Sequence, residues 1–214
     1  METITKLTNL KLLSRLSPSH HRHAPLCKLS PTFFDWYLRW RHSKGYGVHS
    51  PFAYRFITDV LKPGDYGYYA YHQLEYLNRN LKSGRYSFLR EAKFLIRLAI
   101  FLNTKRIISY NTKNPEAQIV AKALKKIYFC CESISNITFK DGDLLLISPG
   151  SNEPEDIIEK SIEHNVPVFA INPSAEVREL LYKPADHGVL FAGKSRMLKI
   201  PRPQMEYVAY IINF

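Results

Sequence analysis

The feature that most constrains the fold is the alternation of short apolar runs with amphipathic segments after Lys105. Short apolar runs between turn residues favour buried strands, and the segments between them have helical spacing. The expected strands are RIISY, IYFCC, DLLLIS, VPVFAI, GVLFAG and MEYVAYIINF, with ITF as a further candidate; the expected helices are PEAQIVAKALKK, EPEDIIEKSIEHN and AEVRELLY. This alternation predicts a Rossmann-like α/β fold over residues 105–214, with a mostly parallel sheet covered on both faces.

The last two expected strands lack a helix between them. They are GVLFAG and MEYVAYIINF, and only the excursion KSRMLKIPRPQ joins them. Since parallel neighbours need a longer crossover, this connection favours antiparallel pairing at the C-terminal edge of the sheet. The stretch GKSR within it lacks the upstream glycine of a phosphate-binding loop, and we expect it to form a turn.

Residues 31–104 are expected to form an aromatic-rich helical region before the sheet. A first helix is expected in PTFFDWYLRWRHSKG and a long one over residues 86–102. The aromatic residues of this region and the tyrosines of DYGYYAYHQLEYL are expected to pack, although aromatics beside basic residues can also stack on nucleobases. The basic row Arg90, Lys93 and Arg97 is expected on a solvated face.

Residues 1–30 are predicted to be a basic, mobile tail. They contain five basic residues and one acidic residue, and no apolar run follows the first charges as in a signal peptide. His20, His21 and His23 in this tail have no evident partner ligands, so no metal site is predicted. The three cysteines show no disulfide framework, and no apolar run is long enough to span a membrane, so a cytoplasmic protein is expected.

The net charge of +11 belongs to the first half of the chain. Residues 1–106 carry 18 Lys and Arg against 6 Asp and Glu, whereas residues 107–214 carry 12 against 13. Such a field attracts polyanions, nucleic acid among them. The alternative is a charge that serves solubility and binds no specific partner.

Three parts of the sequence carry a family resemblance. They are GYGVHSPFAYRFITDVL after an aromatic helix, the helix that ends at the first strand, and the closing HGVLFAG and MEYVAYIINF. Together they resemble a bacterial group of class I S-adenosylmethionine-dependent methyltransferases, over most of residues 31–214. The resemblance implies an HSPF corner before a Rossmann-like domain, S-adenosylmethionine as the cofactor, and a cofactor site at the strand ends.

The cofactor positions that the resemblance implies are Tyr110, Asn111, Glu132 and Ser148. Glu132 matches the acid that binds the ribose, although a solvated strand-end carboxylate is an equal alternative. The loop after RIISY is NTKNPEA, which has no glycine to let a cofactor approach the backbone. DLLLIS runs into Ser148 and Pro149 where relatives have an aspartate, and Asn172 stands where they have acids. The short segment between the second and fourth expected strands lacks a helix and much of the third strand.

His49, in the HSPF corner, has two interpretations. As a general base it needs a substrate proton and an orienting partner, which the sequence does not identify. Alternatively, Pro51 opens a helix, Ser50 caps it, and His49 bonds a carbonyl of a neighbouring element. The second interpretation is favoured, and His49 and Asn172 are the weak candidates for catalysis.

Three functions follow from these observations. The first is a methyltransferase-like protein with a degenerate cofactor site, a pseudoenzyme for which S-adenosylmethionine binding is doubtful. The second is an active methyltransferase that uses Glu132 to bind the ribose. The third is a module whose basic, aromatic first half binds nucleic acid or another polyanion.

Overall fold

The computed structural model of the chain describes residues 31–62, 68–80, 86–133, 137–149, 151, 154–183 and 187–214. The chain divides into two units, Met1–Tyr37 and Leu38–Phe214. Except for the first half of helix α2 (Pro31–Ser43), every described element belongs to the second unit. The tail predicted over residues 1–30 lies outside the described residues, and the boundary near residue 105 stays a prediction.

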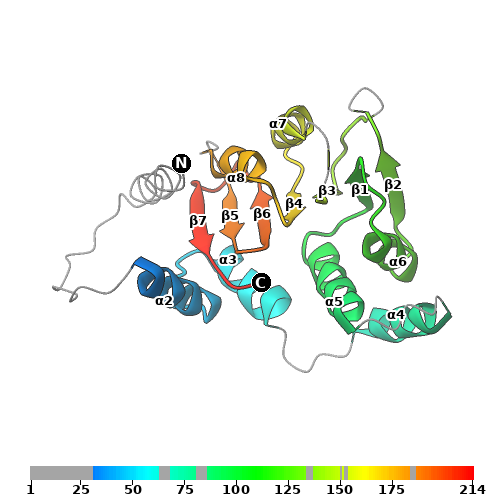
Figure 1. Cartoon of the computed structure of the whole chain (residues 1–214), viewed down its shortest axis with the longest axis horizontal. Helices are drawn as coiled ribbons and strands as arrows, with labels where there is room; N and C mark the ends of the chain where they lie inside the picture. Colours follow the sequence, from blue (N-terminus) through cyan, green and yellow to red (C-terminus); the bar gives the residue numbers. More distant parts are fainter. Residues whose placement is uncertain are drawn as a thin grey trace. The chain divides into compact units, whose positions relative to one another are not determined.

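Among the described residues, seven strands form one sheet in the order β2-β1-β3-β4-β6-β5-β7 (Figure 1). Their bounds are Arg106–Tyr110 (β1), Ile127–Cys131 (β2), Asp143–Ile147 (β3), Val168–Ile171 (β4), Val189–Ala192 (β5), Arg196–Ile200 (β6) and Val208–Ile211 (β7). Neighbouring strands are parallel except for β6, which is antiparallel to both β4 and β5. The Rossmann-like α/β fold with an antiparallel C-terminal edge is therefore confirmed.

The antiparallel strand lies in a part of the sequence where no strand was expected. It is β6, within the segment interpreted as an excursion. The antiparallel pairing expected between the last two predicted strands is wrong, because β5 and β7 run parallel to each other. The predicted turn at GKSR is the hairpin from β5 to β6, where Gly193 N–H donates to the Arg196 carbonyl at 2.8 Å. Because β6 reverses the chain and residues 201–207 return it, β7 can run in the direction of β5.

The prediction of a strand at ITF, residues 137–139, is wrong. Ile137 and Phe139 lie in no strand, although both side chains are buried in the core. β2 is therefore the last strand of the described sheet at this edge. This agrees with the missing third strand inferred from the short connection.

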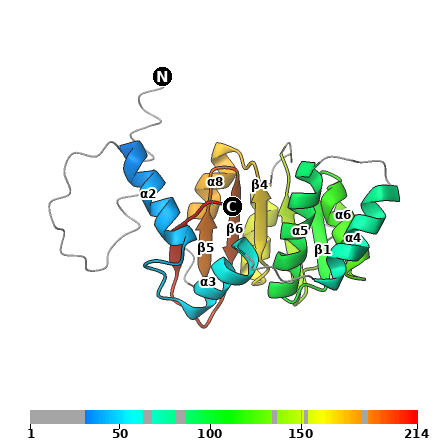
Figure 2. The ribbon, with the colours of Figure 1, turned by 90° about the horizontal axis from the view of Figure 1, so that it is seen from below.

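Helices cover both faces of the sheet (Figure 2). One face packs against α3 (Pro51–Arg55), the π-helix η1 (Phe56–Leu61), α4 (Tyr69–Asn80), α5 (Tyr86–Phe101) and α6 (Pro115–Ala123). The other face packs against α7 (Glu155–Glu163) and α8 (Ala175–Tyr182). This is the three-layer arrangement typical of parallel sheets.

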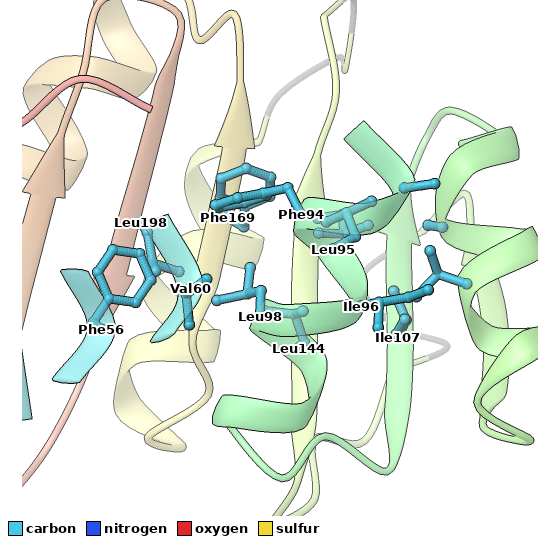
Figure 3. Packing of buried hydrophobic residues seen from close by; sticks show 14 of the residues in the cluster. Phe56, Val60, Phe94, Leu95, Ile96, Leu98, Ile107, Leu144, Phe169 and Leu198 are labelled. Atoms are coloured by element: carbon cyan, nitrogen blue, oxygen red, sulfur yellow. The ribbon is translucent and has the colours of Figure 1, made fainter. Parts of the chain in front are cut away.

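In the described part of the chain, two hydrophobic clusters form the core, one on each face of the sheet. Alternate residues of a strand point to opposite faces, so Leu144 belongs to one cluster and its neighbour Leu145 to the other. In the first cluster Leu98 of α5 lies close to Leu144, beside Val60 of η1 (Figure 3). The exposed fraction is at most 1% for each of these residues: Val60, Leu98, Leu144 and Leu145.

Helix α5 confirms the predicted apolar stripe and corrects its basic row. Arg90 is exposed, but Lys93 and Arg97 are only partly so. Lys93 Nζ donates to Glu75 of α4 at 2.8 Å, and Arg97 Nε donates to the Val60 carbonyl at 2.8 Å. This row therefore joins α4 and η1 to α5, because long basic side chains can place their stems on apolar surface and their charges at its rim.

The expectation that the aromatic residues pack is wrong for several of them. Trp36, Tyr37 and Trp40 of α2 are 55%, 39% and 42% exposed. Tyr69 and Tyr76 of α4 are more exposed still. An aromatic residue near a helix end keeps its polar group in water while part of the ring packs, so composition alone does not place it in the core.

Candidate functional site

The candidate site lies where the strand order reverses, at the carboxyl ends of β1, β3 and β4. From β1 the chain passes through α6 to β2 on one side, and from β3 it passes through α7 to β4 on the other. The two helices cover opposite faces of the sheet. A crevice opens at such a switch point, and it is the usual ligand site of open α/β sheets.

The loop from β1 to α6 is held by its own hydrogen bonds. Asn111, at φ 55°, donates its N–H to the Cys131 carbonyl at 2.7 Å. Asn114 is the N-cap of α6, and its Oδ1 accepts from Ala117 N–H at 2.8 Å. The N–H of Asn114 donates to the Tyr128 hydroxyl of β2 at 3.0 Å. Three backbone donors at this helix start, the N–H groups of Asn111, Asn114 and Ala117, are therefore bonded within the protein rather than available to a ligand phosphate or carboxylate.

A cavity of about 340 Å³ lies beside this loop. Residues from four elements and their connections line it, among them Glu91, Asn114, Glu116, Ser148, Asn172 and Arg196. Asn114 Nδ2 donates to Ser148 Oγ at 3.4 Å, which ties the start of α6 to the end of β3. The lining is rich in charged and amide groups.

An ion pair forms one wall of the cavity. Arg196, the first residue of β6, donates to Glu91 Oε2 from α5, and both side chains are only 15% exposed. The guanidinium also lies over the Phe94 ring, 5.6 Å from its centroid. Burial raises the pKa of the Glu91 carboxyl, Arg196 opposes that shift, and the charge of Glu116 adds to it. Glu91 Oε1 is buried without a hydrogen-bond partner among the described residues.

The cofactor positions predicted from the sequence are divided between the cavity and its surroundings. Ser148 lines the cavity, whereas Tyr110, Asn111 and Glu132 are not among its lining residues. Tyr110 is buried at the end of β1, and its carbonyl accepts from Ser151 Oγ at 3.1 Å. Glu132 is exposed after the end of β2.

The two weak catalytic candidates lie in different places. Asn172, at φ 45° after β4, lines the cavity, and its N–H donates to the Ser195 carbonyl at 2.6 Å. His49 is exposed and is not among the lining residues. Its backbone and that of Ser50 bond the hydroxyl of Tyr210 in β7.

The HSPF corner has the cap and the helix start that were predicted for it, whereas no bond from the His49 ring to a carbonyl occurs among the described residues. Ser50 Oγ caps α3 by accepting from Ala53 N–H at 3.3 Å, and Pro51 is the first residue of that helix. Phe52 packs against Phe101, with ring centroids 5.1 Å apart. The corner therefore sets the start of α3, and Phe52 packs this helix against the end of α5.

Four residues of the cavity were missed by the sequence reasoning: Glu91, Asn114, Glu116 and Arg196. The string NPE, in which a capping residue precedes proline and an acid, is the signal that identifies Asn114 and Glu116. Glu91 and Arg196 are 105 residues apart and meet only through the packing of α5 against β6. No local pattern marks that pair.

No group of three or more His, Cys, Asp or Glu side chains suited to a metal ion occurs in the described part of the chain. The tail histidines lie outside it. Among these residues no helix is long and apolar enough to cross a membrane. A scan against models of protein families finds no match, and no curated protein matches the sequence.

Proposed function

We propose that this chain is a class I methyltransferase-like protein whose cofactor site is degenerate and does not support methyl transfer. The architecture supports the first part, because a Rossmann-like α/β sheet preceded by helices is what the family resemblance implies. The HSPF corner before the sheet also agrees with that resemblance. The second part depends on the loop after β1.

The observation that carries the proposal is the internally bonded loop. A nucleoside cofactor needs bare backbone and available N–H donors at this position. Here no glycine occurs between Asn111 and Ala117, and the N–H groups of Asn111, Asn114 and Ala117 already donate within the protein. A cofactor would have to displace the Tyr128 hydroxyl and the Asn114 cap to reach them.

A calorimetric titration tests this proposal. The full chain is titrated with S-adenosylhomocysteine, and we expect no saturable heat up to about 1 mM ligand. Tyr128→Phe, which frees the Asn114 N–H without adding bulk, serves as a matched variant. It is also expected not to bind S-adenosylhomocysteine, because the N–H groups of Asn111 and Ala117 remain bonded within the protein. Micromolar binding by the wild type that is lost in Glu132→Ala would favour the active methyltransferase instead.

A second function is supported by a different surface. The α2–α3 surface consists of Trp40, Arg41, Lys44, Tyr46, Tyr54, Arg55 and Lys62. Trp40, Tyr46 and Tyr54 are 42%, 61% and 50% exposed, and the Trp40 and Tyr46 rings are 6.3 Å apart between centroids. Residues 38–62 hold five Lys and Arg against one acid, Asp59.

The chemistry of the α2–α3 surface suits single-stranded nucleic acid. Exposed rings can stack on bases while lysine and arginine neutralise phosphates. Lys44 and Lys62 lie close together, and burial together with the charge of Lys44 lowers the pKa of Lys62. Two neighbouring ammonium groups repel each other unless an anion lies between them.

Salt dependence and charge reversal test the second function. An oligouridine of about 12 nucleotides is titrated at several salt concentrations, with heparin as a polyanion without bases. Lys44→Glu with Lys62→Glu is expected to weaken binding at least about tenfold and to reduce the slope of log K against log salt by about 1.4. Lys122→Glu with Lys125→Glu, on α6 and its C-terminal turn, is the matched control. An equal loss of oligouridine affinity in both double variants would contradict specific binding at the α2–α3 surface. Affinity that does not change with salt concentration would also contradict it.

A further inference from the structure

The cavity beside the β1–α6 loop has the size of a small-ligand site. Its volume of about 340 Å³ lies at the lower end of the range for ligand pockets. Ile171 and Pro149 provide apolar surface, and the other lining residues are polar or charged. Such a cavity suits a molecule about as large as an amino acid.

The charge of the cavity favours a cation. Two carboxylates, Glu91 and Glu116, line it together with one guanidinium, Arg196, so these three side chains sum to −1. Arg196 is already committed, because it donates to Glu91 and lies over the Phe94 ring. An anion would meet two acids and only this engaged arginine.

One carboxylate oxygen of Glu91 lacks a hydrogen-bond donor among the described residues. Its Oε2 accepts from Arg196, whereas its buried Oε1 has no partner among the described residues. A buried carboxylate oxygen without a donor is costly, so unpaired groups of this kind are rare and call for an explanation. Glu91 lines the cavity, so an ammonium group bound there would supply a donor and a positive charge to this carboxylate.

The lining of the cavity also includes neutral polar groups. Ser148, Asn172 and Ser195 line it at the ends of β3 and β4 and in the β5–β6 hairpin. Hydroxyl and amide groups donate to carbonyl or hydroxyl oxygens without bringing charge. They can bind a second polar group of a ligand whose ammonium group meets the acids.

We infer that this cavity binds a small primary amine, whose ammonium group pairs with Glu91 and Glu116 and whose other end accepts hydrogen bonds from Ser148 and Asn172. The inference goes beyond the proposed function and does not depend on it, since the titration below contains no S-adenosyl compound. It requires only the cavity and the Glu91 oxygen Oε1, which has no donor among the described residues.

Saturation-transfer NMR on the full chain tests this inference. The probes are L-leucinamide and putrescine, with N-acetyl-L-leucinamide and 1,4-butanediol as their uncharged counterparts. Both amines are expected to bind with dissociation constants up to about 10 mM, and the uncharged molecules are expected to give no signal. Glu91→Gln and Glu116→Gln are each expected to weaken amine binding at least about fivefold, since each removes one carboxylate charge.

The control variant is Glu75→Gln, which removes an ion-paired acid on α4 that is not among the cavity's lining residues. It should bind the amines like the wild type. The Glu116→Gln variant keeps the test decisive if Glu91→Gln alters the fold, which circular dichroism would detect. Failure of both amines to bind the wild type, equal signals from the uncharged molecules, or unchanged binding in Glu116→Gln would each overturn the inference.

Discussion

At the scale of single residues, Asn114 holds the β1–α6 loop in place through the hydrogen bonds of its backbone and side chain. It is 8% exposed, its Oδ1 caps α6 at Ala117, and its Nδ2 reaches Ser148. Asn114→Ala should lower the free energy of unfolding by about 2 kcal/mol, because it removes a cap and leaves buried polar groups unpaired. Urea denaturation measures this value. Ser174→Ala, which removes only the exposed cap of α8, should cost about 1 kcal/mol; an equal or larger loss there would contradict the role given to Asn114.

Lys199 of β6 predicts a pH dependence of stability. Its side chain is 2% exposed, its Nζ donates to the Lys183 carbonyl at 2.9 Å, and burial with the charge of Lys183 lowers its pKa from 10.5 to about 8. Between pH 8 and 10 the unfolded chain therefore binds more protons than the folded one, so stability rises with pH. Lys199 should therefore raise the free energy of unfolding by about 2 kcal/mol between pH 8 and 10, since a shift of one pKa unit corresponds to about 1.4 kcal/mol.

The measurement is urea unfolding of the wild type and Lys199→Met at pH 8, 9 and 10. The rise in unfolding free energy that is attributed to Lys199 should be missing in Lys199→Met. The difference between the two stability curves therefore separates Lys199 from tyrosines that titrate at higher pH, such as Tyr207, whose pKa burial raises to about 12. Lys194→Met, in the exposed turn before β6, should behave like the wild type. Parallel curves for wild type and Lys199→Met would refute the assignment.

Residue types and positions explain which parts of the site could be predicted. Ser148 and Asn172 follow clear apolar strands, so their place at the carboxyl edge was identifiable from the chain alone. Glu91 lies among basic residues of a helix, so the sequence alone suggests that its side chain is exposed to solvent. Its partner Arg196 begins a strand that the sequence pattern does not reveal. Only the packing of α5 on the sheet brings these two charges together.

At the scale of elements, β2 is an exposed edge. It pairs with β1 on one side and is the last strand of the described sheet on the other, and Ile127 at its start is 64% exposed. Unpaired edges of apolar strands promote association between chains. We expect concentration-dependent self-association in about 1 M salt, where the Debye length of about 3 Å screens the positive charge.

Ile127→Lys should weaken this association several-fold in sedimentation velocity, because lysine on an edge opposes pairing. Ile100→Lys changes an isoleucine that is 45% exposed on α5 rather than on a strand, so it is the matched control. If the wild type stays monomeric, or if both variants behave alike, the edge does not mediate contacts.

Elements also differ in how far their sequences predict them. Strands β1 to β5 and helices α5 to α8 have uninterrupted patterns and were predicted. β6 was missed because RMLKI carries two basic residues and is followed by prolines, which is unusual for a strand between two others. The sheet accepts Lys199 because its long stem is apolar and its amino group reaches a carbonyl at the rim.

At the scale of the whole molecule, the sheet joins two cores into one structure. The first cluster includes Leu98 of α5, and the second includes Leu145 of β3 and the buried thiol of Cys131. Both clusters depend on the same strands, because alternate side chains of each strand enter opposite cores. We therefore expect the two faces to unfold together rather than separately.

Thiol labelling of Cys131 tests this coupling. In a background with Cys27→Ser and Cys130→Ser, Cys131 is the only thiol, and it reports opening of the second cluster. Leu98→Ala, in the first cluster, should destabilise the chain by about 3 kcal/mol, which corresponds to roughly 100-fold faster labelling if one global opening exposes the thiol. Leu145→Ala, in the thiol's own cluster, should accelerate labelling by a similar factor. If only Leu145→Ala has this effect, the second face opens locally and the two cores are independent, whereas equal factors mean that the sheet transmits the loss of one core to the other.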